Sequence, residues 1–235
     1  MKSAFPAFVA SLAVASASSA ALISGWTMPT AFPTGTGSVP TGTSYLPPGP
    51  NGAGVADQGL TAGTELKSVH ALAAATYTSP AGNGSQYAFS SNNWTTGDYY
   101  QAKFSTAGFT DINITWDQAR SSTGPAAFHV LMSIDGGSSF TDLFTYTVLQ
   151  SGGGGAPGTW SSTTYNALYT NTLSLGLTAE NQSEVILRFQ NFEPVASAAT
   201  GSNRIDNIMI YSGAVPAPGA IALLGLAGLV GRRRR

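Results

Sequence analysis

The stretch DINITWDQ, residues 111–118, alternates apolar and polar side chains in the manner of a half-buried β-strand. Its two isoleucines and Trp116 fall on one face, because successive side chains of a strand point to opposite faces. The stretch AFHVLMS at residues 127–133 alternates less strictly, which is typical of a strand covered on both faces. Residues 135–139, DGGSS, tolerate positive φ angles and predict a hairpin turn after it.

Similar short strands recur along the chain, with turn residues between them and no long helical pattern. Nine stretches qualify, namely residues 65–72, 86–90, 99–105, 111–118, 127–133, 140–149, 165–174, 184–191 and 203–211. Short strands at this spacing predict an all-β fold, an antiparallel β-sandwich. We expect the sandwich to be jelly-roll-like.

The chain is poor in charge, and its body is acidic. Charged residues make up 9% of the 235 residues, against about 25% in ordinary soluble domains. Residues 21–214 contain all 11 acidic residues and carry a net charge of −6, so nucleic acid is not expected as a partner. The absence of cysteine excludes disulfides, zinc–thiolate sites and cysteine nucleophiles, and 2 histidines are too few for a multi-histidine metal centre.

Residues 1–20, MKSAFPAFVASLAVASASSA, have the order of a secretory signal peptide. Lys2 gives a positive start, a mostly apolar run follows, and small residues at 15–20 form cleavage patterns. The alternative is an N-terminal membrane helix, but the apolar run is too short to span about 30 Å of hydrocarbon. The sequence therefore predicts export, with the Sec machinery and signal peptidase as partners.

The other end of the chain, VPAPGAIALLGLAGLVGRRRR, has three parts. An extended entry comes first and consists of Val215, Pro216, Ala217, Pro218 and Gly219. An apolar run follows at residues 220–230. The chain then ends in a basic cap of Arg232, Arg233, Arg234 and Arg235. As a helix, the apolar run would be about 16 Å long, which is short for a permanent span. The arginines favour the cytoplasmic side, so we expect a transient membrane anchor with the body outside.

This tail resembles the PEP-CTERM sorting signal, in which a Pro-x-Pro entry, a short apolar helix and an arginine cluster follow one another. The family usually has Glu between the prolines, where this chain has Ala217. The resemblance implies recognition by an exosortase, removal of the tail, and delivery to the cell surface or extracellular matrix. A simple tail anchor is the alternative.

The body is also similar to the bodies of other PEP-CTERM proteins. The similarity lies in three segments: residues 92–100, residues 116–125 and the motif NRIDNI at 203–208. It implies a similar fold and says almost nothing about chemistry. We expect three parts: a signal peptide at 1–20, a sandwich domain at 21–213 with an irregular segment at 27–63, and a sorting tail at 214–235.

No catalytic residues are expected. The Gly-x-Ser-x-Gly elbow of serine hydrolases is absent, and GNGSQ at residues 82–86 is better interpreted as a turn. Asp98, Asp117, Asp135 and Glu193 could supply paired carboxylates, but they fall at strand starts and turns, where acidic side chains usually cap the backbone. The chain is therefore expected not to be an enzyme, with an exported hydrolase as the remote alternative.

Asp206 is the candidate ligand of a structural Ca²⁺. It lies in the motif Ile205-Asp206-Asn207, which resembles strands of jelly-roll carbohydrate-binding modules in which the aspartate binds that ion. Calcium needs six to eight oxygen ligands, so a single aspartate is a weak indication. The alternative is an aspartate bonded to a nearby arginine or backbone amide. No other cofactor is expected.

Trp94 and Trp160 lie beside predicted loops and are the candidate glycan contacts, because flat aromatic rings can stack on the apolar face of a sugar. Trp116 alternates with isoleucines and is assigned to the core. His70 and His129 are expected to be hydrogen-bonded structural residues, and Arg120 to form an ion pair or bind backbone carbonyls.

These features predict a non-enzymatic exported protein of the cell surface or extracellular matrix, sorted by an exosortase-type system and associated with exopolysaccharide. The alternative function is that of a carbohydrate-binding module with a structural calcium ion.

Overall fold

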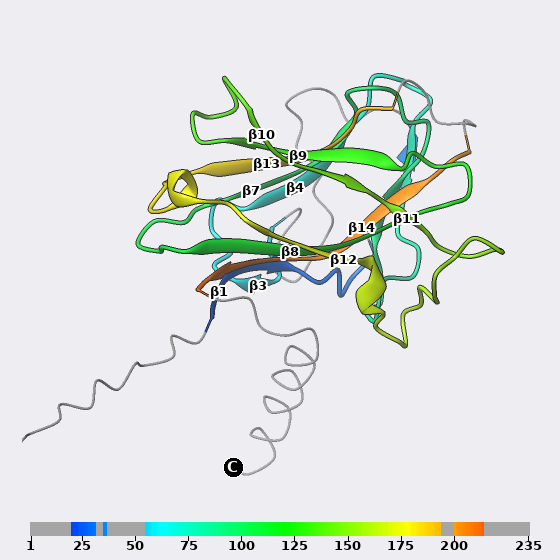
Figure 1. The fold of residues 1–235 in the computed structure, drawn as a ribbon, viewed down its shortest axis with the longest axis horizontal. Helices are drawn as coiled ribbons and strands as arrows, with labels where there is room; N and C mark the ends of the chain where they lie inside the picture. Colours follow the sequence, from blue (N-terminus) through cyan, green and yellow to red (C-terminus); the bar gives the residue numbers. More distant parts are fainter. Residues whose placement is uncertain (1–19, 32–34, 37–54, 194–199, 214–235) are drawn as a thin grey trace, which may run out of the picture.

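The computed structural model describes residues 20–31, 35–36, 55–193 and 200–213. Two β-sheets lie one above the other and form a sandwich (Figure 1). Almost every strand pair is antiparallel; in the described part, the one parallel pair joins a two-residue strand at Leu149 to the end of a long strand at Ala119. The predicted all-β, jelly-roll-like antiparallel sandwich is confirmed.

The smaller sheet, drawn above in Figure 1, has five strands. They are β4 (Glu65–Val69), β7 (Tyr99–Phe104), β9 (Ala127–Ser133), β10 (Thr141–Thr147) and β13 (Val185–Asn191). Their order across the sheet is β10-β9-β13-β7-β4, so β13 lies at the centre and β10 at one edge. The segments brought together at the centre are far apart in the sequence.

The larger sheet is built around two long strands, β8 (Ile112–Arg120) and β14 (Asn203–Ser212). Its other strands in the described part are β1 (Ala21–Trp26), β2 (Gly35–Thr36), β3 (Gln58–Gly59), β5 (Thr76–Thr78), β6 (Phe89–Ser91), β11 (Leu149–Gln150) and β12 (Thr170–Ser174). The strand β14 pairs with β8 on one side and with both β1 and β6 on the other. Two 3-10 turns, at Ala167–Tyr169 and Leu177–Ala179, lie in the connections around β12.

The space between the sheets is filled by apolar and aromatic side chains. Trp116 is fully buried, as predicted, and its ring meets Tyr146 edge-on with centroids 5.2 Å apart. Polar side chains in the interior bond to one another: the Tyr146 hydroxyl donates to Gln118, and the Gln118 amide donates to Asn203 at 2.8 Å. A buried polar group without a partner would destabilise the fold, and these contacts avoid that cost.

All nine predicted strand stretches overlap a strand of the structure, and the bounds of β9 agree with the prediction. The stretch at 165–174 is strand only in its second half, because residues 167–169 form a 3-10 turn. The strands β1, β2, β3 and β5 were not predicted, and β11 shares only Leu149 with the predicted stretch 140–149. The strands β2 and β3 lie within the segment expected to be irregular.

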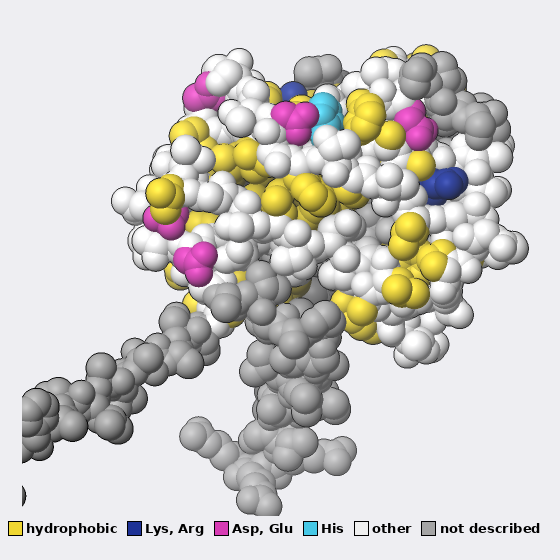
Figure 2. Space-filling model, viewed as in Figure 1, with side chains coloured by type: hydrophobic (Ala, Val, Ile, Leu, Met, Phe, Trp, Pro, Cys, Tyr) yellow, Lys and Arg dark blue, Asp and Glu magenta, His cyan; other side chains and the backbone are white. Residues whose placement is uncertain are grey.

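Most of both predicted terminal signals lies outside the described residues, as does the expected C-terminal helix. No helix within the described ranges is long and apolar enough to cross a membrane. Figure 2 shows few charged side chains on the face in view, as the low charged content leads one to expect. Apolar side chains gather in a band across the middle of this view, where Figure 1 shows the two sheets meeting.

Candidate functional site

The outer side of the five-stranded sheet carries two rows of mostly polar side chains. Every second residue of β13 is fully buried, so Arg188 and Gln190 point away from the core. Strand pairing places Arg188 beside Gln101 of β7, and Gln190 beside His129 of β9. The rows are therefore assembled from strands that are remote in the sequence.

Arg188 is held between two aromatic rings. Its Cζ atom lies 4.2 Å from the centroid of Tyr99 and 3.9 Å from that of Phe140, and such cation–π contacts fix a guanidinium in place. Its Nε donates to Oε1 of Gln101 at 2.9 Å. Burial lowers the pKa of Arg188, but an arginine keeps its proton in proteins, so the group stays a cation.

His129 connects β10 to β13 on the same side. Its Nδ1 lies 2.7 Å from Oδ2 of Asp142, and its Nε2 lies 2.9 Å from Oε1 of Gln190. The amide of Gln190 donates in turn to the backbone oxygen of Gly97 at 3.0 Å. The exposed Phe192 packs against the imidazole, with centroids 5.5 Å apart. As predicted, His129 is a hydrogen-bonded residue of the sheet.

We call this group the Arg188 layer. It consists of Tyr99, Gln101, His129, Phe140, Asp142, Arg188 and Gln190. Its amide, imidazole, carboxylate and guanidinium groups offer both hydrogen-bond donors and acceptors, and its rings offer apolar surface. Because the side chains hold one another, a ligand would lose little by ordering them.

The structure places Trp94 in the core. Its side chain is 1% exposed, and its ring meets His70, Tyr100 and Phe128 edge-on. The indole nitrogen donates to the backbone oxygen of Ser91 at 2.9 Å. Protein therefore covers the ring faces that a glycan would need, and this tryptophan is not available as a surface platform.

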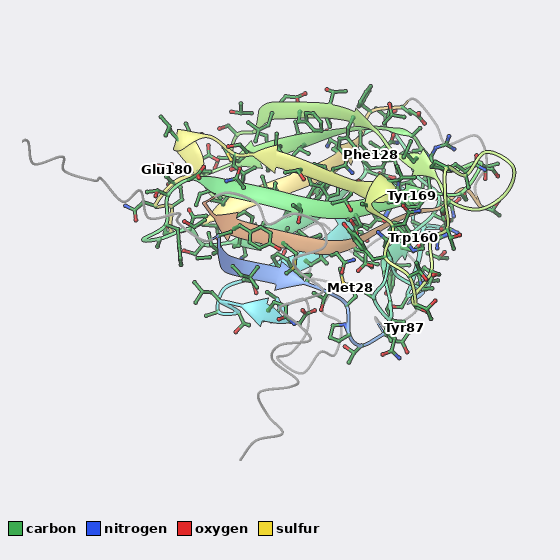
Figure 3. The ribbon with its side chains drawn as sticks, turned by 60° about the horizontal axis from the view of Figure 1, so that its bottom comes forward. Met28, Tyr87, Phe128, Trp160, Tyr169 and Glu180 are labelled. Carbon is green, nitrogen blue, oxygen red and sulfur yellow. The ribbon has the colours of Figure 1, made fainter. Side chains whose placement is uncertain are left out.

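Trp160 is half-buried at one end of the sandwich, next to Tyr169 (Figure 3). The two rings meet edge-on with centroids 5.2 Å apart, and the indole nitrogen donates to the backbone oxygen of Ala81 at 2.7 Å. The guanidinium of Arg204 lies 5.7 Å from the ring centroid. Of the two tryptophans predicted to contact a glycan, Trp160 remains in a suitable position.

Asp206 is fully buried opposite Asp117 in the pairing of β14 with β8. Its carboxylate accepts from the backbone N–H groups of Asn83 and Asn207 and from the hydroxyl of Ser85. Hydrogen-bond donors thus surround the carboxylate, whereas calcium needs a cage of oxygen ligands. Within the described residues, no group of three or more His, Cys, Asp or Glu side chains could hold a metal ion. Calcium at Asp206 stays a prediction.

The acidic residues considered for catalysis have local structural partners. Asp98 accepts from the backbone of Thr95 and Ala71, and Asp135 accepts from Ser133 and Ser139. Glu193 accepts from the backbone N–H of Ala127 at 3.0 Å. Asp117 is 1% exposed and is bonded to Thr170 and two asparagines. These contacts match the capping roles expected from the sequence.

Two other predictions can be placed. Arg120 donates to the backbone oxygens of Val148, Ser121 and Ser122, so the predicted contact with backbone carbonyls is confirmed. The nine residues of the predicted sorting signal, 215–219 and 232–235, lie outside the described residues.

Sequence reasoning did not identify Arg188 or Gln190 as site residues, and it placed Tyr99 among the aromatic residues that could contact a sugar but preferred Trp94 and Trp160. A signal was present, because β13 reads VILRFQN and β7 reads YYQAKF, with polar residues at alternate positions. What the pattern lacks is the register between the strands. The register decides which polar side chains become neighbours.

No family model matches the chain, and no curated protein matches it either. Some solved structures have a similar arrangement. One is a Clostridium thermocellum endo-1,4-beta-D-xylanase fragment with CBM22-1 and GH10 modules in complex with xylohexaose. The TM-score is 0.42 and the identity 13%, over 81% of this chain and 28% of the xylanase chain.

Two further structures are single modules. The K3 cleaved adhesin domain of Lys-gingipain from Porphyromonas gingivalis has a TM-score of 0.41 and 16% identity, over 82% of this chain and 100% of that chain. A family 11 carbohydrate-binding module from Clostridium thermocellum, in complex with a beta-1,3-1,4-mixed-linked tetrasaccharide, has a TM-score of 0.36 and 14% identity, over 68% and 94% of the two chains. At these values the similarities assign neither a family nor a function to this chain.

Proposed function

We propose that this protein is a non-enzymatic carbohydrate-binding module that holds a neutral glycan on the Arg188 layer. The observation that carries the proposal is the hydrogen-bonded arrangement of the half-buried Arg188, Gln190 and His129 with the buried Gln101 on the outer side of the five-stranded sheet. Sugars present hydroxyl groups that both donate and accept, and a row of amide, imidazole and guanidinium groups matches that chemistry. A few placed polar groups beside apolar rings are typical of ligand sites.

The surrounding aromatic side chains supply the second element of sugar recognition. Tyr99 and Phe140 flank Arg188, and Phe192 is 43% exposed beside His129. Exposed ring surface can cover the apolar face of a pyranose and exclude water from the hydrogen bonds beside it. A row of side chains that runs across several strands suits an extended chain of sugars better than a single small molecule.

We further propose that the protein works at the cell surface or in the extracellular matrix, with exopolysaccharide as its partner. This rests on the sequence of the two ends: the signal peptide at 1–20 supports export, and the tail at 215–235 supports sorting by an exosortase. A transient membrane stage would precede release. A polysaccharide-rich surrounding agrees with a body of low charge and net charge −6, which does not suit nucleic acid.

The test is a glycan array probed with the purified full-length chain, followed by calorimetry on the best ligand. Arg188→Ala should weaken binding about tenfold or more, because hydrogen bonds to a charged group are worth about 1.5–3 kcal/mol. Thr172→Ala is the matched control, since Thr172 is exposed on β12 of the other sheet. Absence of glycan binding, or equal loss in both variants, would refute the proposed function.

A further inference from the structure

Arg204 is a cation without a hydrogen-bond or ion-pair partner in the described part of the chain. Its neighbours in β14, Asn203 and Ile205, are fully buried, so the alternation of the strand points Arg204 away from the core. None of the protein's hydrogen bonds or ion pairs in these ranges uses its guanidinium, and its Nε is buried without an acceptor. All 11 acidic residues are described, and none bridges to it.

Such an arrangement is costly for a protein on its own. A guanidinium has five N–H donors, and burying one without an acceptor forfeits the hydrogen bond that water would supply. The pKa of Arg204 is lowered by burial, but the group remains a cation. The aromatic ring of Trp160, 5.7 Å away, compensates only in part, because a cation–π contact leaves the in-plane N–H groups unbonded.

Arg204 lines a polar hollow, which we call the Arg204 hollow. It has a volume of about 180 Å³ and is walled by β5, β6 and the start of β14. The hydroxyls of Thr78 and Ser202 and the amide nitrogen of Asn92, which line it, donate no hydrogen bond within the described residues. The hollow thus combines one positive charge with several unused donors and no carboxylate, which is the environment that an anion needs.

We infer that the Arg204 hollow binds the carboxylate of an acidic sugar, a uronic acid residue within a glycan, with Trp160 against the ring of that sugar. The guanidinium matches a carboxylate with two parallel N–H donors, and the hydroxyls suit the remaining sugar oxygens. The half-buried indole beside the cation distinguishes this site from a simple phosphate or sulfate site, since a small inorganic anion has no apolar face to stack. The hollow belongs to the nine-stranded sheet, so the inference is independent of the Arg188 layer.

The fluorescence of Trp160 provides a direct readout. The other three tryptophans, Trp26, Trp94 and Trp116, are at most 2% exposed. A ligand in the hollow should therefore change the emission of Trp160 alone. We would titrate the full-length chain with trigalacturonate, with a neutral trisaccharide of equal length and with sodium sulfate, at constant ionic strength.

We expect a saturable change with trigalacturonate, and binding about tenfold or more weaker in Arg204→Met, since charge-assisted hydrogen bonds are lost. Lys103→Met removes the same charge from the other sheet and should leave the titration unchanged. Arg204→Lys keeps the charge but loses the planar fork, so an intermediate affinity is expected. If Arg204→Met does not fold, Arg204→Lys still tests the inference. We expect Arg204→Met to fold, because removal of an unsatisfied buried donor should leave the melting temperature equal or higher.

Three results would overturn the inference: no saturable change with trigalacturonate, equal affinity for the neutral trisaccharide or for sulfate, or unchanged binding in the Arg204 variants. Binding of a neutral glycan to the Arg188 layer, measured by calorimetry in the same variants, reports separately on the proposed function. Arg204→Met should not alter it, because Arg204 belongs to the other sheet. The two proposals can therefore fail independently.

Discussion

Asp117 and Asp206 face each other across the pairing of β8 and β14, and both are buried. Burial is the main cause that raises the pKa of each carboxyl. At Asp117, hydrogen bonds from Asn207, Thr170 and Asn83 partly lower the pKa again. At Asp206, the charge of Asp117 raises the pKa further. Above pH 3.8, the usual carboxyl pKa, the native state holds protons that the unfolded chain has released. Both residues therefore favour the native state most at acidic pH, and this contribution is lost as the pH rises through the raised folded pKa.

Asp117→Asn tests this directly. The amide oxygen can accept from Asn83 and Asn207 as the carboxylate does, and the amide nitrogen can donate to the hydroxyl of Thr170. We expect a higher melting temperature than wild type at pH 8, by roughly 2–4 °C for each kcal/mol gained, and no difference near pH 3. Thermal unfolding of both proteins from pH 3 to pH 8 measures the difference, and a gap that widens towards acid would contradict the sign.

The same melts, repeated with calcium chloride and with EDTA, test the predicted ion. The donors around Asp206 lead us to expect equal melting temperatures in both. A rise in calcium that Asp206→Asn removes would instead assign the ion to this residue and contradict the hydrogen-bonded arrangement described here.

Among the structural elements, the loop at residues 81–87 depends on one buried side chain. Asn83 is 0% exposed; its amide donates to Asp117 and to the backbone of Asn166, and its side-chain oxygen accepts from the Asn166 backbone. It therefore joins this loop to β8 and to the segment before β12. Gly84 keeps a positive φ of 72° beside Tyr165, where a side chain would collide with that residue.

Asn83→Ala should destabilise the protein by about 2–4 kcal/mol, because three hydrogen bonds of a buried side chain, one of them fully buried, are lost together. Asn171→Ala is the matched control: Asn171 is half-buried in β12, and its side chain makes no hydrogen bond within the described residues. Urea unfolding followed by fluorescence measures both. Equal stabilities of the two variants would show that Asn83 does not secure the loop.

The strands whose bounds the sequence predicted best, such as β8, β9 and β14, are long enough for alternation to be visible, whereas the three-residue β6 was predicted only as part of the longer stretch 86–90. The missed strands have two or three residues, as in β3 and β5, or interrupt the pattern with Ser-Gly, as in β1. Two residues are too few to show an alternation of apolar and polar side chains. The conformation of such a short strand is determined by pairing with its partner strand rather than by its own side chains.

The candidate site was less predictable than the fold. Alternation in β13 indicates that Arg188 and Gln190 share a face, but their neighbours come from β7 and β9, some sixty to ninety residues away in the chain. Register of that kind arises from tertiary packing. The same limit explains Trp94, whose position beside a turn suggested the surface, although the β6–β7 connection carries it into the core.

At the scale of the whole molecule, the two ends are predicted to direct where the folded body works. Intact mass and fractionation of the native product should show that about twenty residues are missing from each end, as expected for signal-peptide cleavage and exosortase processing. Replacing Arg232 to Arg235 with serine should disrupt retention and processing, because the basic cap no longer holds the tail on the cytoplasmic side. Unchanged surface delivery and mature mass in that variant would refute the sorting prediction.

The sandwich turns the outer sides of its two sheets in opposite directions, and each carries one of the proposed sites. A single rigid molecule with two such sites can form a junction between two polysaccharide strands. Its effect on a hydrated matrix would then be mechanical. Stiffness would rise with the number of junctions, would peak when strands and protein are matched in amount, and would fall again when excess protein occupies each strand separately.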